Sequence, residues 1–179
     1  MRYVSSVIGK IDEISDWVGR AVSWLTLLMV VLTAYDVIMR YIFQISYVFM
    51  QEIEWYLFSL VFLLAAGYGL RHDSHVRVDI FYARLGPRGK AWVNVGGALL
   101  FLFPTCFLLI NASLPFVGNS WTDWEGSPDP GGIPFRYLLK TAIPVGFALL
   151  AFQGVSHLLN NLVAAMGWAE PTEGGSHRG

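Results

Sequence analysis

The sequence predicts an all-α protein, an integral membrane bundle of four transmembrane helices with an N-terminal amphipathic helix. Hydrophobic residues make up 55% of its 179 residues and charged residues only 14%. A soluble domain carries about 25% charged residues, so too few charges remain here to cover a surface in water. Four apolar stretches also approach the roughly 20 residues that a helix needs to cross a bilayer. These stretches are residues 21–43, 52–70, 91–116 and 141–163.

The first 20 residues carry apolar side chains at helical spacings of three and four, with polar residues on much of the opposite side. The apolar positions are Val4, Val7, Ile11, Ile14 and Val18. We expect residues 1–20 to form an amphipathic helix that lies in the cytoplasmic interface or against a partner. The following apolar run is too long for the core of a signal peptide, which favours a retained signal anchor. Residues 21–165 then form the membrane domain, and residues 166–179 a flexible cytoplasmic tail.

The orientation follows from the lysines and arginines near the helix ends, because cytoplasmic segments carry the excess. Nine lie in the N-terminal segment, in the second connection and in the C-terminal tail, and three lie in the first and third connections. The sequence therefore predicts a multi-pass membrane protein with both termini in the cytoplasm.

Composition also argues against several functional classes. The net charge of −1 offers no basic surface for nucleic acid. Cys106 is the only cysteine, so it has no partner for thiol redox chemistry. His157 is the only histidine within an apolar run, whereas haem in a bundle needs paired imidazoles inside the spans. We expect no catalytic residue, metal or cofactor in this chain.

Two charges mark the end of the first span. The uncharged part, residues 21–35, would rise only about 22 Å as a helix, less than the hydrocarbon core of about 30 Å. We therefore expect the helix to continue through Asp36 to Arg40, where the two residues have the favourable order for an i, i+4 ion pair. The pair contacts a partner, only anchors the span in the outer interface, or takes part in a proton or ion relay.

Glu52 and Glu54 open the second predicted span, where the positive end of the helix dipole favours carboxylates. A short connection makes the first two spans an antiparallel hairpin, so Arg40 is expected to reach one of these glutamates. An excess of negative charge remains. It is met either by a basic group of another chain or by solvent in the interface.

Prolines and small residues mark the helix geometry. Pro104 lies in the middle of the third predicted span and is expected to kink it. Pro144 is expected in the first turn of the fourth helix, where its missing N–H costs little. Small residues around Gly67, Gly97 and Gly146 predict close helix packing, either within the bundle or against a partner.

The third connection, residues 117–136, combines tryptophans and acids with several turn-forming residues. Trp121 and Trp124 lie beside Asp123, Glu125 and Asp129. Exposed tryptophan beside acid is typical of a protein interface or of a membrane-surface anchor, and the sequence does not separate the two.

A series of short motifs runs from the end of the first span to just past the second. They are Asp36 to Tyr41, Gln51 to Trp55, Phe62 to Tyr68, Arg71, and His75-Val76-Arg77-Val78-Asp79. In this order they resemble the small permease subunit of TRAP transporters, the DctQ-like subunit. That family has an arginine ending helix one, acids opening helix two, a late small-residue patch, then arginine and His-x-x-Val-Asp. The resemblance covers roughly residues 20–165.

The resemblance implies a three-part secondary transporter of the bacterial inner membrane. A periplasmic substrate-binding protein captures an organic acid, and a large permease subunit carries the acid with sodium. This chain would be the accessory scaffold subunit that pairs with the large permease subunit and contacts membrane lipid. Arg71, His75, Arg77 and Asp79 would fix a cytoplasmic corner or dock the large subunit, without binding metal. The alternative is a self-contained four-helix membrane enzyme or redox carrier.

Overall fold

The computed structural model describes residues 2–72, 82 and 85–167, and every regular element in these ranges is a helix. Four helical segments are long and apolar enough to cross a membrane, which confirms the predicted fold class. The elements are α1 (Arg2–Ile42), α2 (Val48–Arg71), α4 (Pro87–Gly97), the π-helical turn η1 (Ala98–Leu102), α5 (Phe103–Thr122) and α6 (Arg136–Ala165). The segment α4–η1–α5 is continuous and forms the third span.

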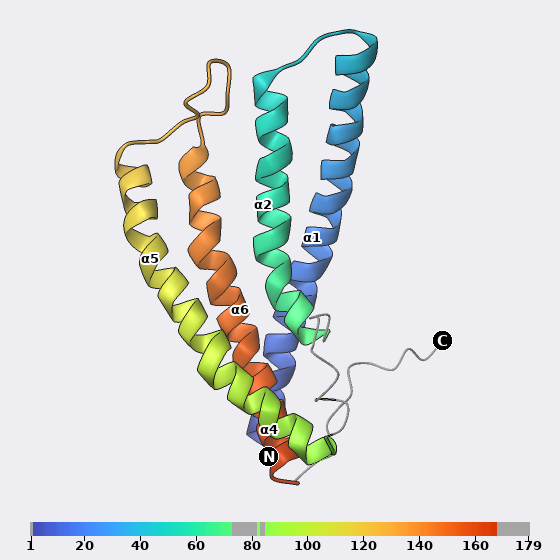
Figure 1. The fold of residues 1–179 in the computed structure, drawn as a ribbon, viewed down its shortest axis with the longest axis vertical. Helices are drawn as coiled ribbons and strands as arrows, with labels where there is room; N and C mark the ends of the chain where they lie inside the picture. The colour runs from blue at the N-terminus through green and yellow to red at the C-terminus, as the bar shows by residue number, and fades with distance from the viewer. Residues whose placement is uncertain (1, 73–81, 83–84, 168–179) are drawn as a thin grey trace.

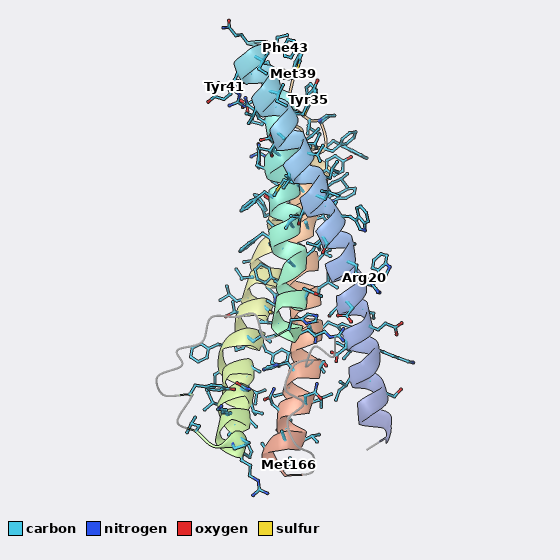
Figure 2. The ribbon with its side chains drawn as sticks, turned by 90° about the vertical axis from the view of Figure 1, so that its right-hand side faces the viewer. Arg20, Tyr35, Met39, Tyr41, Phe43 and Met166 are labelled. Atoms are coloured by element: carbon cyan, nitrogen blue, oxygen red, sulfur yellow. The ribbon has the colours of Figure 1, made fainter. Side chains whose placement is uncertain are left out.

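The helices form two antiparallel hairpins, α1 with α2 and α5 with α6 (Figure 1). The hairpins lie close together where the chain begins and diverge towards the connections 43–47 and 123–135. We call this second end the loop end and the opposite one the terminal end. Tyr41 and Phe43 lie at the loop end, and Met166 lies at the terminal end (Figure 2). Helix α6 is central, because it contacts α1, α2, α4, η1 and α5.

Large apolar side chains face outwards and small or polar ones face inwards. Trp24 and Phe101 are each 73% exposed, whereas Gln153 is 2% exposed and Ser156 is fully buried. In hydrocarbon there is no hydrophobic force between helices, so close packing and interhelical hydrogen bonds hold them together. The burial pattern is therefore that of a bundle surrounded by lipid.

The N-terminal segment is part of α1 and not a separate helix, since α1 runs without a break from Arg2 to Ile42. The side that faces the bundle is mixed, with Ile11 and Ser15 both buried, while Val7 and Ile14 of the apolar stripe are 48% and 44% exposed. Among the stripe residues from Val7 onwards, only Ile11 is buried. The location of this segment at a membrane interface stays a prediction.

Helix α2 begins earlier than expected, and this moves the two glutamates. It starts at Val48, so Glu52 and Glu54 lie beyond the first turn, which holds no acid. The prediction that they open the helix is wrong, because the apolar residues 48–50 extend it at its start. Helix α5 ends at Thr122, so the third connection is residues 123–135 and Trp121 is helical.

The prolines act differently from one another. Before Pro104 the chain forms the π-helical turn η1, in which the N–H of Phe103 donates to the carbonyl of Ala98, five residues back. A proline has no N–H for the carbonyl four residues back, and a π turn is a common local adjustment in membrane helices. Pro144 lies inside α6, which begins at Arg136. The expectation that it occupies the first turn is therefore wrong.

Of the glycines at the contact between α2 and α6, Gly146 lies closest to the other helix. A Cβ atom at Gly146 would lie 2.9 Å from the backbone oxygen of Leu63. A Cβ atom at Gly67 would lie 3.4 Å from the backbone oxygen of Leu149. By contrast, a Cβ atom at Gly69 or Gly97 would meet nothing within 4 Å. The close packing expected from the sequence therefore occurs within the bundle at Gly67 and Gly146.

We predict that Gly146→Ala destabilises the bundle. The methyl group meets backbone, which cannot rotate away, and such overpacking costs about 1–3 kcal/mol. Gly69→Ala in α2 is the matched control, because it gains the same helix propensity in open space. Thermal unfolding of the detergent-solubilised protein should show a lower midpoint for Gly146→Ala only. Equal midpoints for the two variants would contradict the close approach.

Candidate functional site

The sequence-predicted residues divide between the two ends of the bundle. Asp36 and Arg40 on α1, Glu52 and Glu54 on α2, and the tryptophans of residues 121–124 belong to the loop end. Arg71 ends α2 towards the terminal end. His75, Arg77 and Asp79 lie outside the described residues.

The first charge group joins the loop ends of α1 and α2. The Arg40 guanidinium donates to the Asp36 carboxylate, which is the i, i+4 ion pair expected from the sequence. Asp36 is only 4% exposed. Glu54 lies within electrostatic range of both residues, and its Oε1 has no hydrogen-bond partner among the described residues. Two acids and one base leave an excess of one negative charge in this group.

Glu52 belongs to a different group, although it lies only two residues from Glu54. Residues two apart on a helix point about 200° away from each other, so the two carboxylates cannot serve one cluster. Glu52 accepts a hydrogen bond from the Ser127 hydroxyl and another from the N–H of Ile133, with an N···O distance of 2.6 Å. Arg40 therefore pairs within α1, and Glu52 instead fixes the connection 123–135 to α2.

The connection is shaped around this carboxylate. The N–H of Ser127 donates to the carbonyl of Ile133 at 2.9 Å, which closes a narrow loop. A Cβ atom at Gly132 would lie 2.7 Å from the Glu52 carboxylate, so the loop needs a glycine there. Glu52 itself is only 4% exposed. Two donors from the loop take the place of water as hydrogen-bond partners of this buried carboxylate. The loop is therefore a fixed part of the bundle.

A second contact holds the same connection to α6. Lys140 donates to the carboxylate of Glu125, and Arg136 Nε lies 3.7 Å from the other carboxylate oxygen. The hydrogen bond from Lys140, followed by one from Ser120, holds the pKa of Glu125 below its ordinary value. Glu125 is therefore ionised and paired at neutral pH.

The tryptophans also contact α6. The indole N–H of Trp121 donates to the hydroxyl of Thr141 at 2.8 Å, and its ring centroid lies 4.7 Å from that of Tyr137. Trp124 packs edge-on against Tyr137 at 5.5 Å, yet it remains 69% exposed. Its φ of 47° lies in the left-handed region, which a bulky residue rarely adopts. Trp124 is thus held outwards at a cost in backbone strain.

The terminal end contains a polar network that the sequence analysis missed. The Asp12 carboxylate accepts from Gln153 at 2.9 Å and from Ser156 at 2.8 Å, and Ser15 donates to Gln153. Arg71 of α2 donates to the backbone carbonyl of Asp12 and pairs with Asp16. The available signal was the pair of polar residues three apart within the apolar run of α6.

These contacts are suited to holding helices in place. Asp12, Gln153 and Arg71 join three helices at one end, and Glu52 and Glu125 join the connection to two helices at the other. Each of these polar groups is neutralised or hydrogen-bonded by another part of the same chain. Glu54 differs, because one of its carboxylate oxygens is left without a partner.

We predict that Glu52→Ala opens the connection without unfolding the helices. The change removes the acceptor of the part-buried Ile133 N–H, at a cost of about 1 kcal/mol. Hydrogen–deuterium exchange should therefore speed up in residues 127–133 and stay unchanged in α1. Glu54→Ala is the matched control and should leave exchange in this segment as it is. Unchanged protection in Glu52→Ala would show that other contacts hold the loop.

The comparisons with known proteins agree with this architecture. The family model "Tripartite ATP-independent periplasmic transporters, DctQ component" matches residues 29–164. The chain is also similar to the C4-dicarboxylate TRAP transporter small permease protein DctQ of Vibrio cholerae, with 27% identity over 147 residues. The alignment covers 70% of this chain and 62% of that relative. Because the family model spans most of the four-helix domain, the chain belongs to the DctQ family of TRAP transporter small permeases.

Proposed function

We propose that this small permease protein is the scaffold of a tripartite transporter that imports organic acids with sodium. It pairs with a large permease subunit that carries the transport site, and a periplasmic binding protein delivers the substrate. The observation that carries the scaffold role is the use of buried polar groups to join helices, with Gln153 and Ser156 at the centre of the bundle. The relative from Vibrio cholerae is named for C4-dicarboxylates, which supports a carboxylate substrate.

Several further expectations belong to this proposal. Sodium coupling resides in the large subunit, and this chain needs no cofactor for its role. The family is one of transporter subunits and not of enzymes, which leaves the alternative of a membrane enzyme or redox carrier without support. Contact with nucleic acid has no basis in a chain of net charge −1.

The group Asp36, Arg40 and Glu54 is our candidate contact with the large subunit. It carries one excess negative charge, and the unpartnered oxygen of Glu54 suits a basic side chain from another protein. Trp124 is the candidate contact at the surface of the loop end, because it is strained and exposed. Its partner is the large subunit or the binding protein.

Orientation is part of the proposal. The chain begins and α6 ends at the terminal end, and the connections 43–47 and 123–135 lie together at the loop end. The excess of lysine and arginine belongs to the terminal side, so we expect that side in the cytoplasm.

The orientation is tested with a reporter enzyme that is active only in the periplasm. Fused after Ser127, in the connection 123–135, the reporter should be active. Fused after Arg88, near the start of α4, it should be inactive. The reverse pattern would overturn the proposed orientation while leaving the fold untouched.

Pairing with the large subunit is tested by co-expression and co-purification with the candidate large permease of the same genome. Glu54→Gln should reduce the amount of large subunit recovered without lowering the unfolding temperature of the chain alone, because it removes only the excess charge. Arg40→Ala should lower both, since a buried Asp36 then loses its partner; because the Arg40 side chain is 46% exposed, we expect a cost nearer the roughly 0–1 kcal/mol of an exposed pair than the roughly 3–5 kcal/mol of a buried one.

Glu13→Gln, an exposed change on α1 at the other end, is the control and should alter neither quantity. Wild-type recovery of the large subunit by Glu54→Gln would refute this contact. Failure of the wild-type chain to recover any large subunit would refute the scaffold role itself.

A further inference from the structure

A groove runs along the outer surface of the bundle at the loop end, between α2 and the α5–α6 hairpin. Its volume is about 360 Å³. Trp55, Phe62 and Phe116 are among its aromatic lining residues, and Ile143 lies at its deeper end. From Arg136 to Ile143, α6 rises about 10 Å, so the groove extends from the start of α6 towards the middle of the bundle.

The charged side chains of the groove are confined to one end and carry one sign. Arg136 and Lys140, in the first two turns of α6, are its only charged lining residues among those described. Lys140 Nζ lies 3.9 Å from the centre of the Phe116 ring. The compensating acids Glu125 and Glu52 do not line the groove. A ligand in the groove therefore meets two cations at the surface and aromatic or aliphatic carbon below them.

This gradient matches a phospholipid, with a phosphodiester above an acyl chain. A free anion would leave the aromatic walls unused. Arginine and lysine donors at the level of the headgroups are suited to a lipid phosphate.

We infer that this groove is a binding site for one phospholipid of the leaflet on the loop side. The phosphodiester accepts hydrogen bonds from Arg136 and Lys140, and one acyl chain lies between Phe62 and Phe116. Because Lys140 and Arg136 also hold Glu125, the phosphate competes with this carboxylate for the same donors, and the bound lipid is expected to loosen the connection 123–135. This inference does not depend on the transporter assignment.

The test is native mass spectrometry of the full-length protein in detergent with three probes. Palmitoyl-oleoyl phosphatidylglycerol should be retained as a one-to-one adduct. Palmitoyl-oleoyl glycerol, which lacks the phosphate, and glycerol 3-phosphate, which lacks the chains, should each be retained about tenfold less, as expected for the loss of a charged hydrogen bond or of buried apolar area. Equal retention of phosphatidylglycerol and palmitoyl-oleoyl glycerol would overturn the phosphate site.

Two loss variants and one gain variant locate the site. Arg136→Gln should reduce phosphatidylglycerol retention about tenfold. Ser59→Phe, which fills the groove without touching the cations, should do the same, whereas Thr33→Phe on the exposed side of α1 should not. Glu125→Gln removes the acid behind the cations and should increase retention, a result that misfolding does not produce. Wild-type retention in both Arg136→Gln and Ser59→Phe would refute the site.

The same variants separate a lipid from a protein occupant. If the groove binds a lipid, Ser59→Phe lowers lipid retention in the chain purified without the large permease. If Ser59→Phe instead prevents co-purification of a co-expressed large permease and leaves lipid retention in the isolated chain unchanged, a protein side chain occupies the groove and the inference is overturned.

Discussion

The bundle depends on the fact that apolar burial does not drive its helices together. In a membrane the outward-facing Trp24 and Phe101 are as well solvated by lipid as they would be by other side chains. Association must come from close backbone approach and from polar groups that hydrocarbon cannot satisfy. Gly146 supplies the close backbone approach, because a glycine has no Cβ atom and α6 can therefore contact the backbone of α2. Gln153 supplies the second, because its amide joins α6 to Ser15 and Asp12 of α1.

These contacts make α6 the element on which the other helices are assembled. At the terminal end its polar residues bind α1, and Asn161 accepts a hydrogen bond from Asn94 of α4 at 2.8 Å. At the loop end its first two turns carry Lys140, which binds the connection through Glu125. One helix therefore contributes fixing contacts at both ends.

The sequence was sufficient to predict features that depend on local spacing. The apolar runs predicted four spans, and the i, i+4 spacing predicted the ion pair of Asp36 with Arg40. It could not predict the partners of Glu52, since Ser127 and Ile133 lie 75 and 81 residues away along the chain. Nothing in their residue types distinguishes them from other loop residues. The contact can therefore be recognised only when the positions of α2 and α6 in the fold are known.

The polar side of the N-terminal segment shows a different limit. In water, an amphipathic helix packs through its apolar stripe, and the polar positions are read as exposed. Here the buried side combines Ile11 of the stripe with the polar Ser15, while Ile14 faces outwards. The spacing of the residues was informative, but the direction of the buried face is set by the hydrogen bonds of Ser15 and Asp12 to α6. Pro144 shows a limit for helix boundaries, because α6 begins at Arg136, about one and a half turns before the apolar run that marked its predicted start.

The two glutamates of α2 differ in where their hydrogen-bond partners come from. One is bonded within the chain, and the other has an oxygen that is available to another protein. Their separation of about 200° around the helix axis places Glu52 against the connection and Glu54 beside the end of α1. Glu52 is satisfied within the chain by two donors, whereas one oxygen of Glu54 is not. An unpaired, partly buried carboxylate oxygen is costly when a chain stands alone. That cost is removed when another protein supplies a donor, so the same imbalance that weakens the isolated chain would favour its assembly with a partner.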